Sequence, residues 1–119
     1  MQTPGIRLLD ILESIDAVAD ITNGLTFESY SDDYKTRRAV ERCVEVISEA
    51  TRHLPSNWKS DFPNTPWREI AAIGNLLRHE YYRVDDLLMW KIATQSLPEL
   101  RPVIVELQSR LPPPDLDQN

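Results

Sequence analysis

Apolar residues recur every three to four positions along most of this 119-residue chain, which is the spacing of one buried face of an α-helix. Strict alternation of apolar and polar residues, the pattern of a half-buried strand, is weak. The pattern therefore predicts an all-α fold. The first helix is predicted over residues 6–21, with an apolar face made of Leu8, Ile11, Leu12, Ile15, Val18 and Ala19.

Turn residues and prolines set the limits of the next predicted elements. Asn23-Gly24 predicts the end of the first helix, and residues 25–31 are expected to form a short connection. Ser31-Asp32-Asp33 supplies candidate N-cap residues for a long helix that ends near Leu54, before Pro55. The apolar face of this helix is predicted to hold Ala39, Val40, Cys43, Val46, Ile47 and Ala50.

The second half of the chain predicts a loop and further helical segments. Residues 55–66 contain three prolines and no periodicity, so they are expected to form a structured loop. Thr65 and Pro66 are expected to begin the next helix as its N-cap and first helical residue. The apolar pattern lapses at 78–82, resumes over 84–93, and a last helix is predicted near 98–110. Its inward residues are predicted to be Val103, Ile104 and Leu107, with Pro98 in the first turn.

Four or five helices with short connections predict a small antiparallel helical bundle as one domain over residues 1–111. Residues 112–119 form a proline-rich, acidic tail that is expected to fray. A bundle of this size has a modest core, which favours a homodimer. The chain has no apolar run of the ~18 residues typical of a membrane helix, no signal-peptide pattern and a single cysteine. The expected location is cytoplasmic.

The charge of the chain is unevenly distributed. Its 13 Lys+Arg and 19 Asp+Glu give a net charge of −6. Residues 1–34 carry one basic and seven acidic side chains, 35–83 carry nine and six, and 84–119 carry three and six. The total argues against broad, non-specific binding of nucleic acid, whereas the positive middle segment is compatible with a local anion site.

Most metal and nucleophile sites are excluded by the inventory of side chains. A structural zinc site needs four N or S ligands, and the chain offers His53, His79 and Cys43. Cys43 is interpreted as a small hydrophobic residue of a helix face. No metal and no cofactor are expected.

Three glutamates, Glu41, Glu45 and Glu49, recur every four residues, a spacing that can build carboxylate metal sites in helical bundles. They lack the Glu-x-x-His partners of such sites. We interpret them as solvated or paired with neighbouring arginines.

The segment from Asn75 to Tyr81 clusters an amide, a guanidinium, an imidazole and a phenol. On a continuous helix, Asn75, Arg78, His79 and Tyr82 would share one face. Histidine exchanges protons near neutral pH, and arginine can bind a phosphate through two hydrogen bonds. A base for the 2′-OH proton and a cation for the phosphorane are sufficient for metal-independent RNA cleavage.

A structural role is the alternative for the same cluster. Polar side chains at the end of a helix can cap its last turn and pair with Asp85 or Asp86. The residue types alone leave both interpretations open.

The stretch WREIAAIGNLLRHEY at 67–81, followed by Val84-Asp85 and Trp90, resembles the signature of HepT-like proteins, small α-helical members of the HEPN superfamily. Residues 38–50 are similar to their second helix, and the likeness spans roughly residues 6–111. The family motif is Arg, four residues, His, one residue, Tyr. His79 and Tyr81 match it, whereas Gly74 stands at the arginine position and Asn75 matches the polar residue that follows.

The resemblance implies a ribonuclease whose catalytic pair is an arginine and His79. With glycine at position 74, Arg78 is the candidate replacement, and Asn75 completes the candidate catalytic set. Arg42 and Arg38, on the helix upstream, are candidate RNA-binding residues.

The resemblance also implies a partner. HepT-like proteins are similar to the toxin of a type II or type VII toxin–antitoxin pair, an endoribonuclease that acts on cellular RNA. The antitoxin is a minimal nucleotidyltransferase that neutralises the toxin by AMPylation of the motif tyrosine, here Tyr81, with Tyr82 as its neighbour. The alternative is a nuclease-inactive binding or regulatory protein with the same partner. Gly74 in place of the motif arginine is the reason to consider it.

Overall fold

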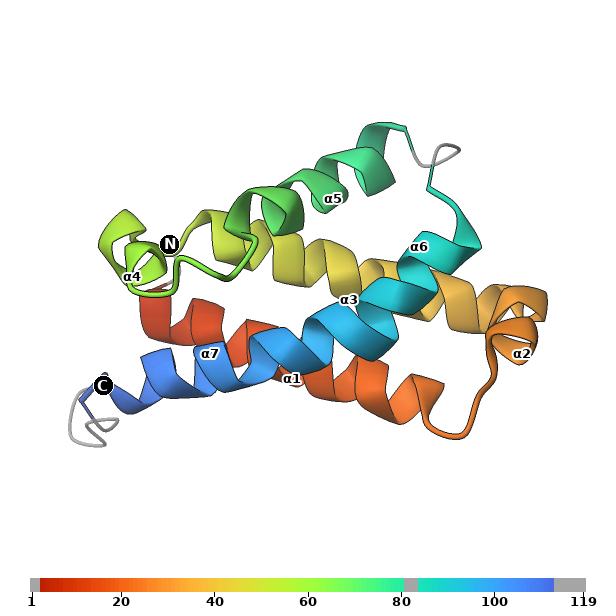
Figure 1. The fold of residues 1–119 in the computed structure, drawn as a ribbon, viewed down its shortest axis with the longest axis horizontal. Helices are drawn as coiled ribbons and strands as arrows, with labels where there is room; N and C mark the ends of the chain where they lie inside the picture. Colours follow the sequence, from red (N-terminus) through yellow and green to blue (C-terminus); the bar gives the residue numbers. More distant parts are fainter. Residues whose placement is uncertain (1–2, 81–83, 113–119) are drawn as a thin grey trace.

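The computed structural model describes residues 3–80 and 84–112. The chain forms four long helices within these ranges and no strand, and the long helices pack into a bundle (Figure 1). Helix α3 packs against α1 and α5, and α7 packs against α1. The predicted all-α helical fold is confirmed. The long helices are α1 (Pro4–Thr22), α3 (Tyr34–Arg52), α5 (Trp67–His79) and α7 (Leu97–Ser109).

Two short helices occupy segments that were expected to be irregular. Helix α2 (Phe27–Asp32) starts with a capping box, in which the Ser29 N–H donates to Thr26 Oγ1 and the Thr26 N–H donates to Ser29 Oγ. Helix α4 (Ser56–Ser60) lies within the predicted loop. The prediction of a short connection at 25–31 and of a structured loop at 55–66 thus missed both helices, because helices of five or six residues are too short to display a period.

The ends of the long helices follow local side-chain chemistry. Thr3 Oγ1 accepts a hydrogen bond from the Ile6 N–H at the start of α1, and Asp33 caps α3 through the Thr36 N–H. After α1, Gly24 adopts a φ of 79°, as predicted for a helix stop. Pro66, rather than Thr65, is the N-cap of α5, so the predicted start is one residue early.

The C-terminal segments form one continuous helical stretch instead of two. Helix α6 (Asp86–Lys91) passes into a π-helical turn, η2 (Ile92–Ser96), and then into α7. The turn ends two residues before Pro98, which has no N–H to donate within a regular helix. Pro98, which was predicted to lie in the first turn of a separate last helix, therefore follows a helical segment without a break.

The core is formed mainly by α1, α3 and α7. The buried face of α3 differs from the predicted one, because α3 is covered by both α1 and α5. Val44, Ser48 and Thr51 are buried, whereas Ala39, Cys43 and Val46 are only partly buried, and Ala19 of α1 is exposed. Among the described residues, no helix combines the length and the apolarity needed to cross a membrane. The fully buried apolar side chains include Leu8, Ile11, Val18, Tyr30, Val40, Ile47, Ile104 and Leu107.

Candidate active site

Helices α3 and α5 are in close contact at Gly74. The Gly74 N–H donates to Ser48 Oγ at 3.1 Å, and Ser48 Oγ donates to the Ala71 carbonyl at 3.0 Å. A Cβ atom on residue 74 would lie 2.4 Å from Ser48 Oγ and 2.8 Å from Ser48 Cβ. An arginine therefore does not fit at this position of the motif unless the two helices move apart.

Arg78 folds back over the position of Gly74, one helical turn earlier. Its Nη1 atom is 3.6 Å from the place where a Cβ of residue 74 would lie. Its Nη2 donates to Asn75 Oδ1 at 2.7 Å. Nη1 is also 3.7 Å from a Glu49 oxygen and 3.9 Å from a Glu45 oxygen. Glu45 and Glu49 of α3 thus hold the Arg78 guanidinium close to the position of the Cβ atom that an arginine at residue 74 would have.

A second arginine reaches the same amide. Arg52 Nη1 donates to Asn75 Oδ1 at 3.3 Å and lies 4.0 Å from Glu49. Glu49 also forms a hydrogen bond of 2.8 Å with His53 Nε2. This hydrogen bond is the largest of the effects that lower the pKa of Glu49, and the positive charges of Arg52 and Arg78 add to it. Glu49 therefore stays ionised and links both arginines.

The sequence did not identify Arg52, His53 or Glu49 as parts of this cluster. The spacing of His53 and Arg52 from Glu49 predicts contacts along α3. It cannot reveal that Asn75 and Arg78 of α5 join them, because that contact depends on where the two helices cross.

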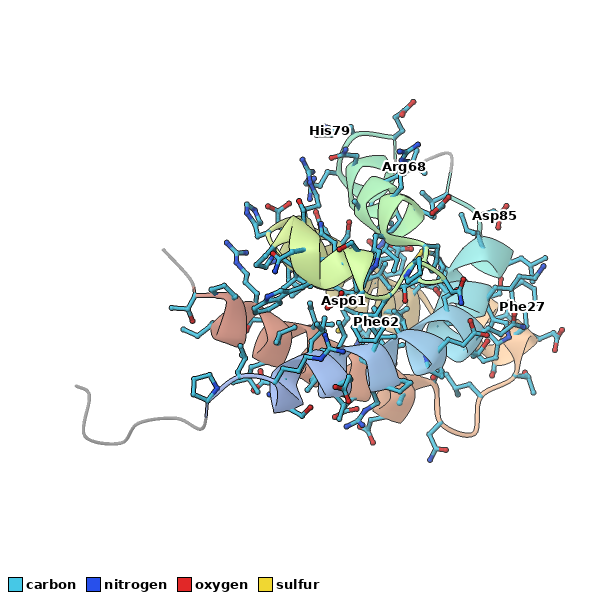
Figure 2. The ribbon with its side chains drawn as sticks, turned by 60° about the vertical axis from the view of Figure 1, so that its left-hand side comes forward. Phe27, Asp61, Phe62, Arg68, His79 and Asp85 are labelled. Atoms are coloured by element: carbon cyan, nitrogen blue, oxygen red, sulfur yellow. The ribbon has the colours of Figure 1, made fainter. Side chains whose placement is uncertain are left out.

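His79 lies outside this network of side chains. It is the last residue of α5, and it is exposed. Figure 2 shows it at the end of α5 that points away from α1 and α7. The structure therefore brings Arg78 and Asn75 together, while His79 follows one position later, about 100° further around the helix.

Helix α5 ends at His79, and Glu80 is its C-cap. Tyr81 and Tyr82 lie outside the described residues. Asp85 accepts a hydrogen bond from the Leu88 N–H at 2.6 Å and caps α6. Asp86 accepts one from Ser31 Oγ at 2.8 Å. Both acids are thus engaged in holding α6, not in neutralising Arg78.

The remaining charged residues of α3 pair largely within the helix, as predicted for the three glutamates. Arg38 Nη1 is 2.6 Å from Glu41, and Arg42 Nη1 is 3.3 Å from Glu45. Glu45 is thereby shared between Arg42 and Arg78. Arg42, with 73% of its side chain exposed, lies beside the cluster, and much of the positive charge of the middle segment is locally balanced.

The other candidate groups of the sequence have ordinary structural surroundings. Cys43 is half-buried, and burial raises the pKa of its thiol, which disfavours the nucleophilic thiolate. Within residues 3–80 and 84–112, no three His, Cys, Asp or Glu side chains are grouped as metal ligands.

The family described as "Ribonuclease HepT-like" matches residues 11–107 of the chain, which include the Gly74–His79 segment. The chain belongs to this family. The HepT-like chain is 37% identical over 94 residues to "Probable ribonuclease HepT" of Thermococcus cleftensis, covering 79% of this chain and 86% of the relative. It is 35% identical, with the same coverage, to "Putative RNase MJ1380" of Methanocaldococcus jannaschii. No solved structure matches it at a significant level.

A bacterial relative extends the likeness over almost the full length of both chains. "Putative RNase TTE0752" of Caldanaerobacter subterraneus is 32% identical over 107 residues, which is 90% of this HepT-like chain and 96% of the relative. The names of all three relatives describe ribonucleases.

Proposed function

We propose that this HepT-like protein is the toxin of a toxin–antitoxin pair, a metal-independent endoribonuclease that cleaves cellular RNA. The observation that carries the proposal is the position of Arg78, whose guanidinium lies over Gly74. A cation is thus available at the place of the missing motif arginine, although it comes from position 78. The ribonuclease names of the relatives support the same reaction.

The proposed chemistry uses His79 as the general base. His79 removes the 2′-OH proton, the 2′ oxygen attacks the phosphorus, and the bond to the 5′ oxygen breaks as that oxygen takes up a proton. Arg78 stabilises the negative charge of the phosphorane. Asn75 positions Arg78 through the 2.7 Å hydrogen bond. The products are a 2′,3′-cyclic phosphate and a 5′-hydroxyl end.

A homodimer is part of the proposal. Arg78 turns toward α3 while His79 is exposed at the end of α5, so a second copy could complete the catalytic pair. Near that end, Leu87 and Leu88 of α6 are 47% and 39% exposed. Covering these side chains would contribute favourably to such an interface.

Replacing Arg78 by alanine is expected to lower the rate of RNA cleavage by about 100-fold, the usual effect of losing one group that stabilises the transition state. Arg78→Lys should retain part of the rate because it keeps the charge but not the planar fork. Initial rates on a labelled single-stranded RNA measure the effect. Arg68→Ala removes an exposed arginine from the first turn of the same helix and is the matched control. Equal rates for the two alanine variants would contradict the role of Arg78.

AMPylation by a minimal nucleotidyltransferase is the proposed means of neutralisation. Tyr81 Oη attacks the α-phosphorus of ATP, loses its proton and releases pyrophosphate. Incubation with ATP and a minimal nucleotidyltransferase antitoxin should add the mass of one adenylyl group and reduce RNA cleavage, since the phosphate adds negative charge near the site. Tyr81→Phe should stay unmodified in intact-mass spectrometry, whereas Tyr82→Phe should be modified. Modification that persists in Tyr81→Phe would assign the acceptor elsewhere.

A nuclease-inactive partner of the same nucleotidyltransferase is the second candidate function. The close contact of Gly74 with Ser48 leaves no room for an arginine side chain at position 74. Glu45 and Glu49 neutralise much of the charge of Arg78, the candidate replacement. This candidate predicts a stable complex with the nucleotidyltransferase and intact RNA even at high protein concentration.

A further inference from the structure

A pocket of about 270 Å³ lies where α1 meets α3 and α5, next to the candidate active site. It is shared by three helices that are distant in sequence, and Arg78 belongs to both the pocket and the site. Its charged lining consists of Arg7, Asp10, Arg42, Glu45, Glu49 and Arg78.

Arg7 is the arginine of this pocket whose hydrogen-bonding capacity the protein leaves unused. Its Nε atom is shielded from solvent and has no hydrogen-bond partner among residues 3–80 and 84–112. Its guanidinium forms no ion pair with a carboxylate of the described residues, whereas Arg42 and Arg78 are both held by Glu45. Arg7 is only partly buried, so the rest of its guanidinium, which no carboxylate of the described residues holds, is available to an acceptor from a ligand in the pocket.

The charge balance of the pocket restricts the ligand. Three arginines face three carboxylates, so the pocket attracts an anion through short-range hydrogen bonds more than through net charge. A phosphodiester carries a single negative charge and presents two non-bridging oxygens, which match a guanidinium fork. A phosphate monoester carries more charge and would be repelled more strongly by Asp10 and the two glutamates. The chemistry therefore favours a phosphodiester.

We infer that the pocket binds a phosphodiester of the RNA backbone adjacent to the one cleaved at Arg78, and that Arg7 of α1 is the residue that contacts its phosphate. This inference rests on the proposed function. It extends the substrate contacts from α3 and α5 to α1, and it gives Arg7 a role in binding, not in the chemical step.

The test measures binding of a labelled single-stranded RNA to the His79→Ala protein, in which turnover is blocked, by fluorescence anisotropy. Adding Arg7→Ala should weaken binding about tenfold, the effect of losing one charge-assisted contact to phosphate. The slope of log K against log salt concentration should fall in magnitude by about 0.7, as expected for one phosphate contact on a single strand. Arg7→Gln keeps a side chain of similar length without the charge and should weaken binding as Arg7→Ala does. It therefore gives a second measurement if the alanine variant misfolds. Arg68→Ala is the control with an equal change in net charge.

Three outcomes separate the inference from the proposed function. If wild type cleaves RNA but Arg7→Ala binds it as tightly as Arg68→Ala, the subsite is wrong while the ribonuclease function stands. If RNA binding depends on Arg7 but wild type leaves RNA intact, the subsite is supported and the nuclease function fails. If the protein binds no RNA, both are overturned.

Discussion

Replacing His79 by alanine is expected to reduce RNA cleavage by at least about 100-fold, because general acid–base catalysis by one histidine commonly contributes 10²–10⁴-fold. Induction of the wild-type protein without its antitoxin should arrest growth, and the variant should not. The thermal midpoint should stay unchanged, since His79 is exposed at the end of α5 and packs little surface. Cleavage rates on purified protein, growth curves and a thermal melt measure the three effects.

His53 provides the matched control for this experiment. It is the other histidine of the chain, it is also exposed, and it bonds Glu49, which in turn lies 3.7 Å from Arg78. His53→Ala should retain most of the cleavage rate. If cleavage survives in His79→Ala but is lost in His53→Ala, the base is His53, oriented by Glu49, and the assignment of the motif histidine is wrong. If wild type and His79→Ala are equally harmless when induced without any partner, the toxin proposal fails.

The sequence predicted what repeats along one helix and missed what depends on contact between helices. The apolar period located α1 and α3, because each buries a long stripe. It missed α2 and α4, which are too short to repeat. Within the site, the contact of Asn75 with Arg78 follows from their spacing of three residues. The roles of Arg52 and Glu49 do not, since they require knowing that α5 crosses α3 at this level.

That crossing depends on two small residues with no visible pattern in the sequence. Ser48 and Gly74 are 26 positions apart, and neither belongs to an apolar stripe that would mark an interface. The same pair explains why the motif arginine is absent and why its space is available to Arg78. Arg7 was equally unpredictable, because only the packing of α1 against α3 brings it to the pocket.

Replacing Gly74 by alanine should therefore destabilise the fold by about 1–3 kcal/mol, the cost of overpacking a close contact. Helix propensity alone would predict that this substitution stabilises the fold, since alanine in a helix is favoured over glycine by about 1 kcal/mol. Contact decides the sign, because the new Cβ would lie 2.8 Å from Ser48 Cβ, an atom that no side-chain rotation can move away. Urea denaturation measures the free energy of unfolding. Gly5→Ala in α1, where the nearest atom is Leu111 Cδ1 at 3.4 Å, should be neutral or stabilising.

A second substitution, on α3, tests whether Gly74→Ala destabilises the fold through this contact or through a general destabilisation of α5. Ser48→Gly removes both atoms that the new Cβ would meet, so the double variant should be more stable than Gly74→Ala alone although it adds a glycine to α3. The coupling energy between the two positions should exceed about 1 kcal/mol. Ser48→Ala should rescue less, because it leaves the Cβ in place. Additive effects of the two substitutions would mean that α3 and α5 lie further apart at Gly74, in which case position 74 has room for an arginine and the reason for the altered motif lies elsewhere.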